Sequence, residues 1–285
     1  MKKQSIPAVN YHLWEPCNMR CKFCFATFQE VKKTILPKGH LPKEDSLKLV
    51  NLLSEHFDKI TFVGGEPTLC PWLPDLIIRA KQLGMNTGIV SNGTRLNEKY
   101  LTELRPYLDW VGLSIDSLNE DTNVKMGRAI AGTKPLNETY YLNLVNLITS
   151  LGFKLKINTV VNKYNYTENL SEFIKVSGTN RWKVFQVLPI KGENDKHIDE
   201  LKITKEEFNF FLANHEKTKH VLVPENNEEM RGSYAMVDPA GRFFENSTGS
   251  IINSDPILKV GVEKAYDMAH PDSDKFIKRG GVYNW

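Results

Sequence analysis

Three cysteines lie close together near the start of the chain. Cys17, Cys21 and Cys24 follow a short run of strand-forming residues and have C-x3-C-x2-C spacing. Three thiolates on one short loop can bind three irons of a [4Fe–4S] cluster, which leaves the fourth iron open to a small molecule. One alternative is a zinc site, which usually takes a fourth protein ligand, and His12 is the histidine nearby. The other is three incidental core cysteines. The spacing favours the cluster.

The remaining cysteine, Cys70, is expected to pack in the core. Three cysteines within eight residues are too dense for a disulfide framework and are typical of a reducing compartment. No long apolar run follows the first lysines, and no window of about 18 apolar residues is present, so neither a secretory signal nor a membrane span is predicted. We expect a cytoplasmic protein without a membrane partner.

The composition is that of an ordinary globular protein. The chain has 285 residues, of which 41% are hydrophobic and 25% charged, and this excludes wholesale disorder and collagen-like repeats. The 37 basic and 34 acidic residues leave a net charge of +3. A protein that binds duplex nucleic acid usually has a larger basic excess, so nucleic acid is disfavoured as a partner.

Strand and helix patterns alternate through the first two thirds of the chain. Strands are expected at Ala8–Trp14, Lys59–Val63, Asn86–Ser91, Trp110–Ile115, Lys154–Val161 and Trp182–Leu188. Helices are expected at Lys43–His56, Trp72–Leu83, Asn97–Leu104, Asn137–Leu151 and Glu168–Val176. This alternation predicts an α/β fold with a parallel sheet of βα units. Six units make an open, partial (βα)6 barrel rather than a closed eightfold one.

The pattern changes after residue 190. A capping-box sequence at Thr204 predicts a helix to about His215, residues 234–246 read as a hairpin, and another helix is expected at Val260–Met268 before a polar tail. We therefore divide the chain into a partial-barrel core, residues 1–190, and a C-terminal extension, residues 191–285, within one catalytic domain.

The cysteine spacing, with Phe23 before the third cysteine, resembles the radical S-adenosylmethionine (SAM) superfamily. In that superfamily the open iron chelates the amino and carboxylate groups of SAM. A second motif, Gly64-Gly65-Glu66-Pro67, lies where the second predicted strand ends. Its glycines would let the backbone approach a ligand closely, and a carboxylate or carbonyl there can accept hydrogen bonds from the SAM ammonium. The resemblance thus implies two cofactors, a [4Fe–4S] cluster and SAM.

Polar residues at the other strand ends complete the expected SAM site. Ser91 and Asp116 suit the ribose and backbone of SAM, and Arg128 suits its carboxylate, although each is also a common turn residue. The full set expected at SAM is Phe23, Gly64, Gly65, Glu66, Pro67, Ser91, Asn92, Ser114, Asp116, Arg128 and Asn158.

Further segments resemble the viperin family, radical SAM enzymes that act on nucleoside triphosphates. Arg181–Gln186 and Lys278–Gly281 carry most of this resemblance, which runs from about Ile6 to Trp285. It implies conversion of a nucleoside triphosphate to its 3′-deoxy-3′,4′-didehydro analogue, a chain terminator in antiviral defence. A 5′-deoxyadenosyl radical made from SAM removes the 4′ hydrogen, the 3′ hydroxyl leaves as water, and one electron and one proton complete the product.

A triphosphate carries about −4 charges and needs cationic side chains around it. The resemblance places Lys59, Lys156, Lys183 and Arg279 at the phosphates. Lysines that face the inside of a sheet are costly unless they meet an anion, whereas lysines on a solvated rim are the alternative. The resemblance also places Arg181 against the nucleobase, Asn10 at the nucleotide, and Tyr234 near the sugar as a catalytic proton or hydrogen donor. CTP, UTP and GTP stay open, with a pyrimidine favoured.

The chain departs from the animal viperins at several positions. Val63 stands where they have a serine, Ala26 where they have a histidine, and Ser247 where they have a cysteine. The segment 247–255 lacks their phosphate-binding lysine, and neither their N-terminal amphipathic helix nor their longer C-terminal extension is present. These differences indicate a prokaryotic viperin and leave the base open.

Two other functions stay open. A peptide-modifying or molybdopterin-type radical SAM enzyme usually carries more cysteines, for an auxiliary cluster, than the single Cys70 left here. A non-enzymatic, zinc-stabilised module that binds nucleotides is the third interpretation. For the leading one we expect a monomer that binds a nucleoside triphosphate and receives electrons from a reductase.

Overall fold

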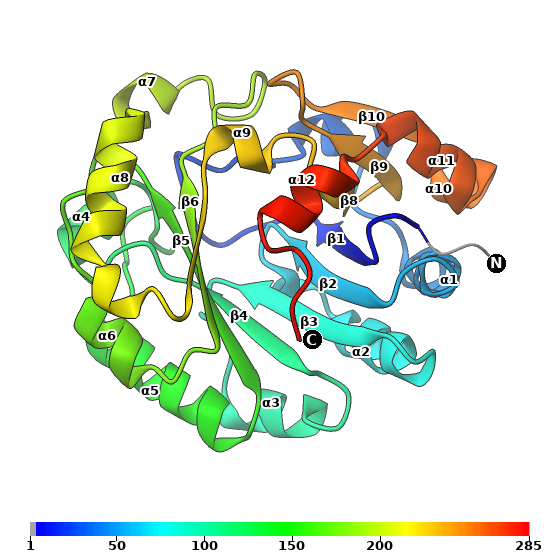
Figure 1. The fold of residues 1–285 in the computed structure, drawn as a ribbon. Helices are drawn as coiled ribbons and strands as arrows, with labels where there is room; N and C mark the ends of the chain where they lie inside the picture. The colour runs from blue at the N-terminus through cyan, green and yellow to red at the C-terminus, as the bar shows by residue number, and fades with distance from the viewer. Residues whose placement is uncertain (1–3, 285) are drawn as a thin grey trace.

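A single ten-stranded sheet organises the chain in the computed structural model, which describes residues 4–284. Residues 1–3 and Trp285, which entered the expectations about the two ends, lie outside the described part. The strand order is β10-β9-β8-β1-β2-β3-β4-β5-β6-β7. Its two ends, β10 and β7, do not pair, so the sheet is not closed (Figure 1). The expected open α/β architecture is confirmed.

Six strands form the parallel centre of this sheet, and they match the predicted ones within one or two residues at either end. They are β1 (Ala8–Trp14), β2 (Lys59–Gly64), β3 (Asn86–Ser91), β4 (Trp110–Ser114), β5 (Lys154–Val161) and β6 (Arg181–Gln186). In β5 burial alternates along the strand: Leu155 and Ile157 are fully buried, whereas Lys156 and Asn158 between them are less so. Successive side chains of a strand point to opposite faces, so one face packs on helices and the other is left for polar residues.

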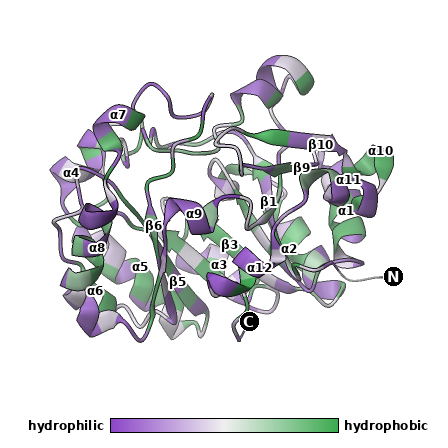
Figure 2. Cartoon of the chain, turned by 45° about the horizontal axis from the view of Figure 1, so that its top comes forward, coloured by the Kyte–Doolittle hydropathy of each residue, from purple (hydrophilic) through white to green (hydrophobic). Residues whose placement is uncertain are grey.

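Helices connect these strands and cover the outer face of the sheet (Figure 1). The predicted ones are α1 (Lys43–Ser54), α2 (Leu73–Gln82), α3 (Glu98–Leu104), α5 (Glu138–Ser150) and α6 (Ser171–Val176). Asn97 and Asn137 cap α3 and α5, because their side chains accept hydrogen bonds from the amides of Tyr100 and Tyr140. Figure 2 shows hydrophilic and hydrophobic residues on the same helices, as expected for helices with one buried side.

The segment after residue 190 extends the sheet at both edges, which the sequence analysis did not foresee. The strand β7 (Leu222–Glu225) joins β6 in parallel at one edge. At the other edge, β8 (Ala235–Val237) pairs in parallel with β1, and β9 (Arg242–Glu245) and β10 (Ile252–Pro256) follow antiparallel. The expected hairpin is therefore present as β8 and β9, but it is also part of the central sheet.

The remaining elements are short helices and turns. They are α4 (Glu120–Lys125), α7 (Ile198–Leu201), α8 (Lys205–Asn214), α9 (Asn227–Met230), α10 (Ile257–Val260), α11 (Val262–Ala269), α12 (Ser273–Lys278), η1 (Val31–Ile35), η2 (Pro67–Leu69) and η3 (Glu216–Thr218). The capping box of α8 formed by Thr204 and Glu207 is confirmed. The expected polar tail contains the short helix α12, which the sequence analysis did not foresee. Among residues 4–284, no helix has the length and apolar character needed to cross a membrane.

Candidate functional site

A cavity of about 980 Å³ lies over the face of the sheet that carries the polar strand residues. Strands β1 to β6 each contribute to its lining, together with the cysteine loop and the segment around Arg279. Every predicted site residue except Pro67 lines this cavity, and Pro67 instead begins the turn η2 behind it. The chain thus brings the predicted cluster, SAM and substrate residues into one space, while their roles stay predictions.

The cysteine loop lies at one end of the cavity and is fixed by backbone hydrogen bonds to a second loop. The amides of Arg20 and Lys22 donate to the carbonyls of Gly127 (3.1 Å) and Met126 (2.9 Å). Gly127 has a φ of +76°, and a Cβ there would lie 2.0 Å from the carbonyl oxygen of Arg20. Only glycine satisfies both requirements, so this close approach sets the path of the cysteine loop.

The three loop cysteines are free thiols that line the cavity. Burial raises the pKa of all three, to about 12 for Cys21 and about 11 for Cys24. Thiolates at this place therefore need a strongly cationic partner. Within the described residues, no three Cys, His, Asp or Glu side chains converge on one metal ion. The donor set suits a cluster in which each thiolate binds its own iron. Cys70, as expected, is buried in the core.

The glycines of the Gly-Gly-Glu-Pro motif make a close backbone contact that the sequence analysis did not foresee. A Cβ on Gly65 would lie 2.2 Å from the carbonyl oxygen of Glu15 and 2.4 Å from that of Pro16. A Cβ on Gly64, whose φ is +156°, would lie 2.5 Å from the carbonyl oxygen of Trp14. The backbone that approaches so closely is the segment leading into the cysteine loop, so these glycines position the loop itself.

The carboxylate of Glu66 also makes hydrogen bonds within the protein. It is 1% exposed and accepts hydrogen bonds from Ser91 Oγ (2.7 Å), the Asn92 amide (2.8 Å), and both the amide and the hydroxyl of Thr68. Asn92 in turn donates to Asn18 Oδ1 (2.8 Å), inside the cysteine loop. Glu66, Ser91 and Asn92 therefore join the ends of β2 and β3 to that loop. The role of the Glu66 carboxylate as an acceptor for the SAM ammonium stays a prediction.

An ion pair between Arg128 and Asp116 forms the wall beside the cysteines. Arg128 Nε donates to Asp116 Oδ2 (2.5 Å), and its guanidinium lies 5.2 Å from the centre of the Phe23 ring. Burial opposes the charge of Arg128, but Asp116 raises its pKa. The amide of Val160 donates to the other Asp116 oxygen (2.7 Å). A cation held in this way keeps its charge and its place for an anionic group of a ligand.

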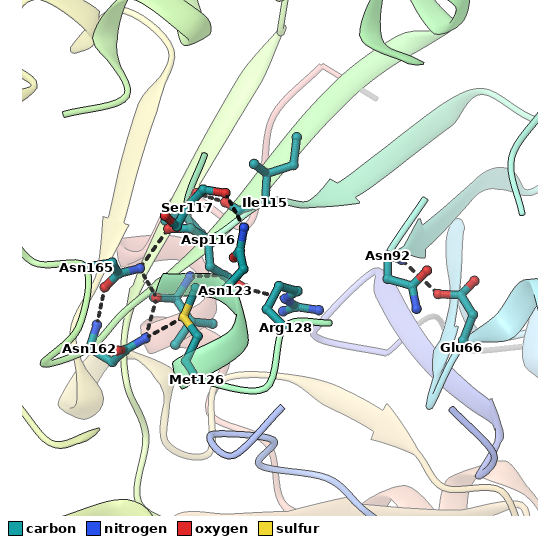
Figure 3. A network of polar contacts seen from close by, with 12 residues as sticks. Glu66, Asn92, Ile115, Asp116, Ser117, Asn123, Met126, Arg128, Asn162 and Asn165 are labelled. Atoms are coloured by element: carbon teal, nitrogen blue, oxygen red, sulfur yellow. Dashed lines mark hydrogen bonds and ion pairs between the residues drawn. The ribbon is translucent and has the colours of Figure 1, made fainter. Parts of the chain in front are cut away.

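Three buried asparagines behind this pair were missed by the sequence analysis (Figure 3). Asn165 Nδ2 donates to the carbonyl of Asp116 (2.7 Å), Asn123 Nδ2 donates to the carbonyl of Ser117 (2.9 Å), and Asn162 contacts Met126 Sδ. Each of the three is fully buried. They connect the end of β4 to the loop that holds the cysteines. Asparagines between predicted elements look like ordinary turn residues, so their sequence gave no such signal.

Basic side chains gather at the other end of the cavity. Lys59, Lys183 and Arg279 are 3%, 7% and 6% exposed, which excludes the solvated rim for these three. Lys156 and Arg181 line the cavity beside them. Burial lowers the pKa of Lys59 to about 6, of Lys183 to about 7 and of Lys156 to about 8, and the neighbouring cations contribute in the same direction. Such a group of buried cations is suited to a ligand with several negative charges.

Two further residues at this end were not among the predicted ones. Glu225, at the end of β7, pairs with Lys183 and with Arg279 and accepts the hydroxyl of Tyr234. Tyr283 accepts a hydrogen bond from Lys59 Nζ (2.6 Å), and its ring lies 4.2 Å from the Arg181 guanidinium. The segment after α12 thus crosses the face of the sheet (Figure 1). The sequence analysis missed the strand β7 because it contains Pro224, and it missed Tyr283 because this residue lies in the polar tail.

Comparisons with known proteins agree with this architecture. A model of the radical SAM superfamily matches residues 13–176. A protein of Lacinutrix mariniflava named S-adenosylmethionine-dependent nucleotide dehydratase is 57% identical over 98% of this chain, which spans 59% of that protein's length. A protein of the same name in Flammeovirga pacifica is 54% identical over 98% of this chain and 96% of its own length. The solved structure of anSMEcpe with bound AdoMet superposes with a TM-score of 0.69 at 14% identity, over 93% of this chain and 78% of that one.

The close contacts of Gly65 predict what a methyl group at this position would do to the cysteine loop. Gly65→Ala should displace the segment at Glu15 and Pro16 and lower the iron content of anaerobically reconstituted protein, because the cysteine loop moves with it. Gly84→Ala is the control: no atom lies within 4 Å of a Cβ there, so its φ of +83° is the one source of strain. Iron and sulfide analysis would measure this, and equal iron content in both variants would contradict the proposed contact.

Proposed function

We propose that this chain, which belongs to the viperin family of S-adenosylmethionine-dependent nucleotide dehydratases within the radical SAM superfamily, removes water from the ribose of a nucleoside triphosphate. The observation that carries the proposal is one cavity with three thiols at one end and five basic side chains at the other. The product would be the 3′-deoxy-3′,4′-didehydro nucleotide, formed by loss of the 4′ hydrogen and the 3′ hydroxyl.

The thiol end suits the two cofactors that the family implies. Cys17, Cys21 and Cys24 would hold a [4Fe–4S] cluster, and the walls formed by Arg128, Ser114 and Asn158 would bind SAM. When bound, the cluster and SAM supply the 5′-deoxyadenosyl radical that removes the substrate hydrogen. Asn158 Oδ1 is buried without a protein partner among the described residues, and this supports a ligand donor at that place.

The basic end suits the triphosphate. Lys59, Lys156, Lys183 and Arg279 would bind the phosphate oxygens, and each charge-assisted contact is worth about 1.5–3 kcal/mol. With the phosphates there and the adenosyl group near the cysteines, the ribose lies between the two ends. Arg181 and Asn10 line the same space for the base and the sugar, and Tyr234 stands beside them.

Several finer points belong to the same proposal. Val63 and Ala26, two of the departures from the animal viperins, both line the cavity, so they are placed to affect which base is accepted. We propose a pyrimidine, with production of a chain terminator for antiviral defence. The electron would come from a reductase, and the protein would act as a cytoplasmic monomer.

The decisive experiment supplies each nucleoside triphosphate singly to anaerobically reconstituted protein with SAM and a reductant. Mass spectrometry would detect 5′-deoxyadenosine and a nucleotide lighter by one water. Stimulation by one triphosphate with that product is the expected result, and Cys21→Ala should abolish both signals. SAM cleavage that ignores every triphosphate would contradict the proposed substrate. A zinc-containing protein without iron–sulfur absorption would contradict the cluster.

Removal of the Arg279 side chain should affect the binding of the triphosphate much more than the binding of SAM. Arg279→Ala should weaken triphosphate binding by about tenfold or more, because a charge-assisted contact is lost, and leave SAM binding nearly unchanged. Lys278→Ala, at the exposed neighbouring position, is the matched control. Calorimetric titration of both ligands would measure this. An equal loss for SAM and triphosphate would show that Arg279 acts on the fold and not on the phosphates.

The lowered pKa values predict that triphosphate binding takes up protons. At pH 8 Lys59 and Lys183, with a pKa of about 6 and about 7, are largely neutral, and bound phosphates raise both values. Groups whose pKa rises on binding gain protons, so affinity should fall as the pH rises from about 6.5 to 8.5. Calorimetry at pH 8 in two buffers of different ionisation enthalpy would give the uptake. No uptake would mean that these lysines are already charged in the free protein.

A further inference from the structure

Glu225 is a buried carboxylate that does not itself line the cavity. Its side chain is 0% exposed, and it lies behind three residues that do line it, Lys183, Arg279 and Tyr234. Its Oε1 pairs with Lys183 Nζ and with Arg279 Nη1 (3.3 Å), and its Oε2 accepts the hydroxyl of Tyr234. One carboxylate thus contacts two proposed phosphate ligands and the proposed catalytic tyrosine.

These contacts fix the direction of the Tyr234 hydroxyl. Lys183 Nζ donates to Tyr234 Oη (2.7 Å), and Tyr234 Oη donates its single proton to Glu225. The guanidinium of Arg279 lies 3.5 Å from the centre of the Tyr234 ring. A phenol held by a donor, an acceptor and a stacked cation has lost its rotational freedom.

Electrostatics supports the same arrangement. Burial alone would raise the pKa of Glu225, but Lys183 and Arg279 hold it below the ordinary value, so the side chain is a carboxylate. Burial, together with Glu225, raises the pKa of Tyr234, so the phenol keeps its proton. Among the buried cations Lys183 gains from this counter-charge, because Glu225 opposes the lowering of its pKa.

We infer that Glu225 is a positioning residue for nucleotide dehydration: by accepting the hydrogen bond of the Tyr234 hydroxyl it holds this phenol in one orientation at the cavity. The inference rests on the proposed function. It assigns to Glu225 an effect on the chemical step that passes through Tyr234, and no contribution to phosphate affinity, since a carboxylate beside phosphates repels them.

Glu225→Gln keeps the size of the side chain and removes its charge. The variant should bind the nucleoside triphosphate at least as tightly as the parent protein, whereas turnover at saturating nucleotide should fall by about 100-fold, the usual effect of a displaced group at a reacting centre. SAM binding should stay the same. The matched control is Glu229→Gln in the same region, whose carboxylate only caps α9 and should leave turnover unchanged.

A double-mutant cycle tests whether Glu225 acts through Tyr234. Tyr234→Phe alone and Tyr234→Phe combined with Glu225→Gln should show the same turnover. Once the Tyr234 hydroxyl is absent, Glu225 has no hydroxyl to hold, so its replacement should cause no further loss. Losses that multiply would overturn the inference, and so would parallel losses of binding and turnover in Glu225→Gln, which indicate a general effect on folding.

A second measurement, the binding of inorganic tripolyphosphate, tests the inference without relying on the proposed function. If the parent protein dehydrates no nucleotide, the proposed function fails. Tripolyphosphate titration of Glu225→Gln still decides the inference, since unchanged or tighter binding supports a role confined to Tyr234, and weaker binding overturns it.

Discussion

A charge removed from water must meet an opposite charge, and this requirement governs both ends of the cavity. At one end burial raises the pKa of three thiols by more than the nearby Arg128 lowers it. At the other end burial lowers the pKa of three lysines, and Lys183 pairs there with the carboxylate of Glu225. A positive cofactor and a polyanionic substrate would satisfy both ends at once. The two requirements are opposite in sign and lie in one continuous space.

The sheet explains how these ends face each other. Strands β1 to β6 provide the floor, and their alternating side chains place Lys156 and Asn158 in the cavity and Leu155 and Ile157 against the helices. The cysteine loop enters from β1 and is held by close backbone contacts with the end of β2. The polar network around Asp116 fixes the third side (Figure 3). The walls beside the thiols are therefore built from main-chain contacts and buried hydrogen bonds, which resist displacement by a ligand.

Much of this could be predicted from the sequence, and the failures have physical reasons. Short strand patterns that alternate with helical ones predicted β1 to β6, spacing predicted the role of the C-x3-C-x2-C loop, and the family resemblance indicated the lysines. The strand β7 was missed because Pro224 breaks the usual strand pattern, although a proline is tolerated there at the edge of the sheet. The contacts of Glu66 and Glu225 were harder to predict. A carboxylate at the end of a strand can be interpreted as a ligand or as a surface charge until its partners are known. The partners of Glu225 come from β6, from the start of β8 and from the end of α12, and no local pattern connects them.

The pairing of β1 with β8 also determines the order in which the molecule can be completed. Val9 and Ala235 are neighbours in the sheet although almost the whole chain separates them. Contacts of such long sequence separation form late, because a large loop must close before they contribute any stability. During synthesis the cysteine loop, the Gly-Gly-Glu-Pro turn and strands β1 to β6 emerge before β8 and Arg279. The part of the chain that carries the cysteine loop can thus assemble on the ribosome while the part that carries Arg279 is still absent.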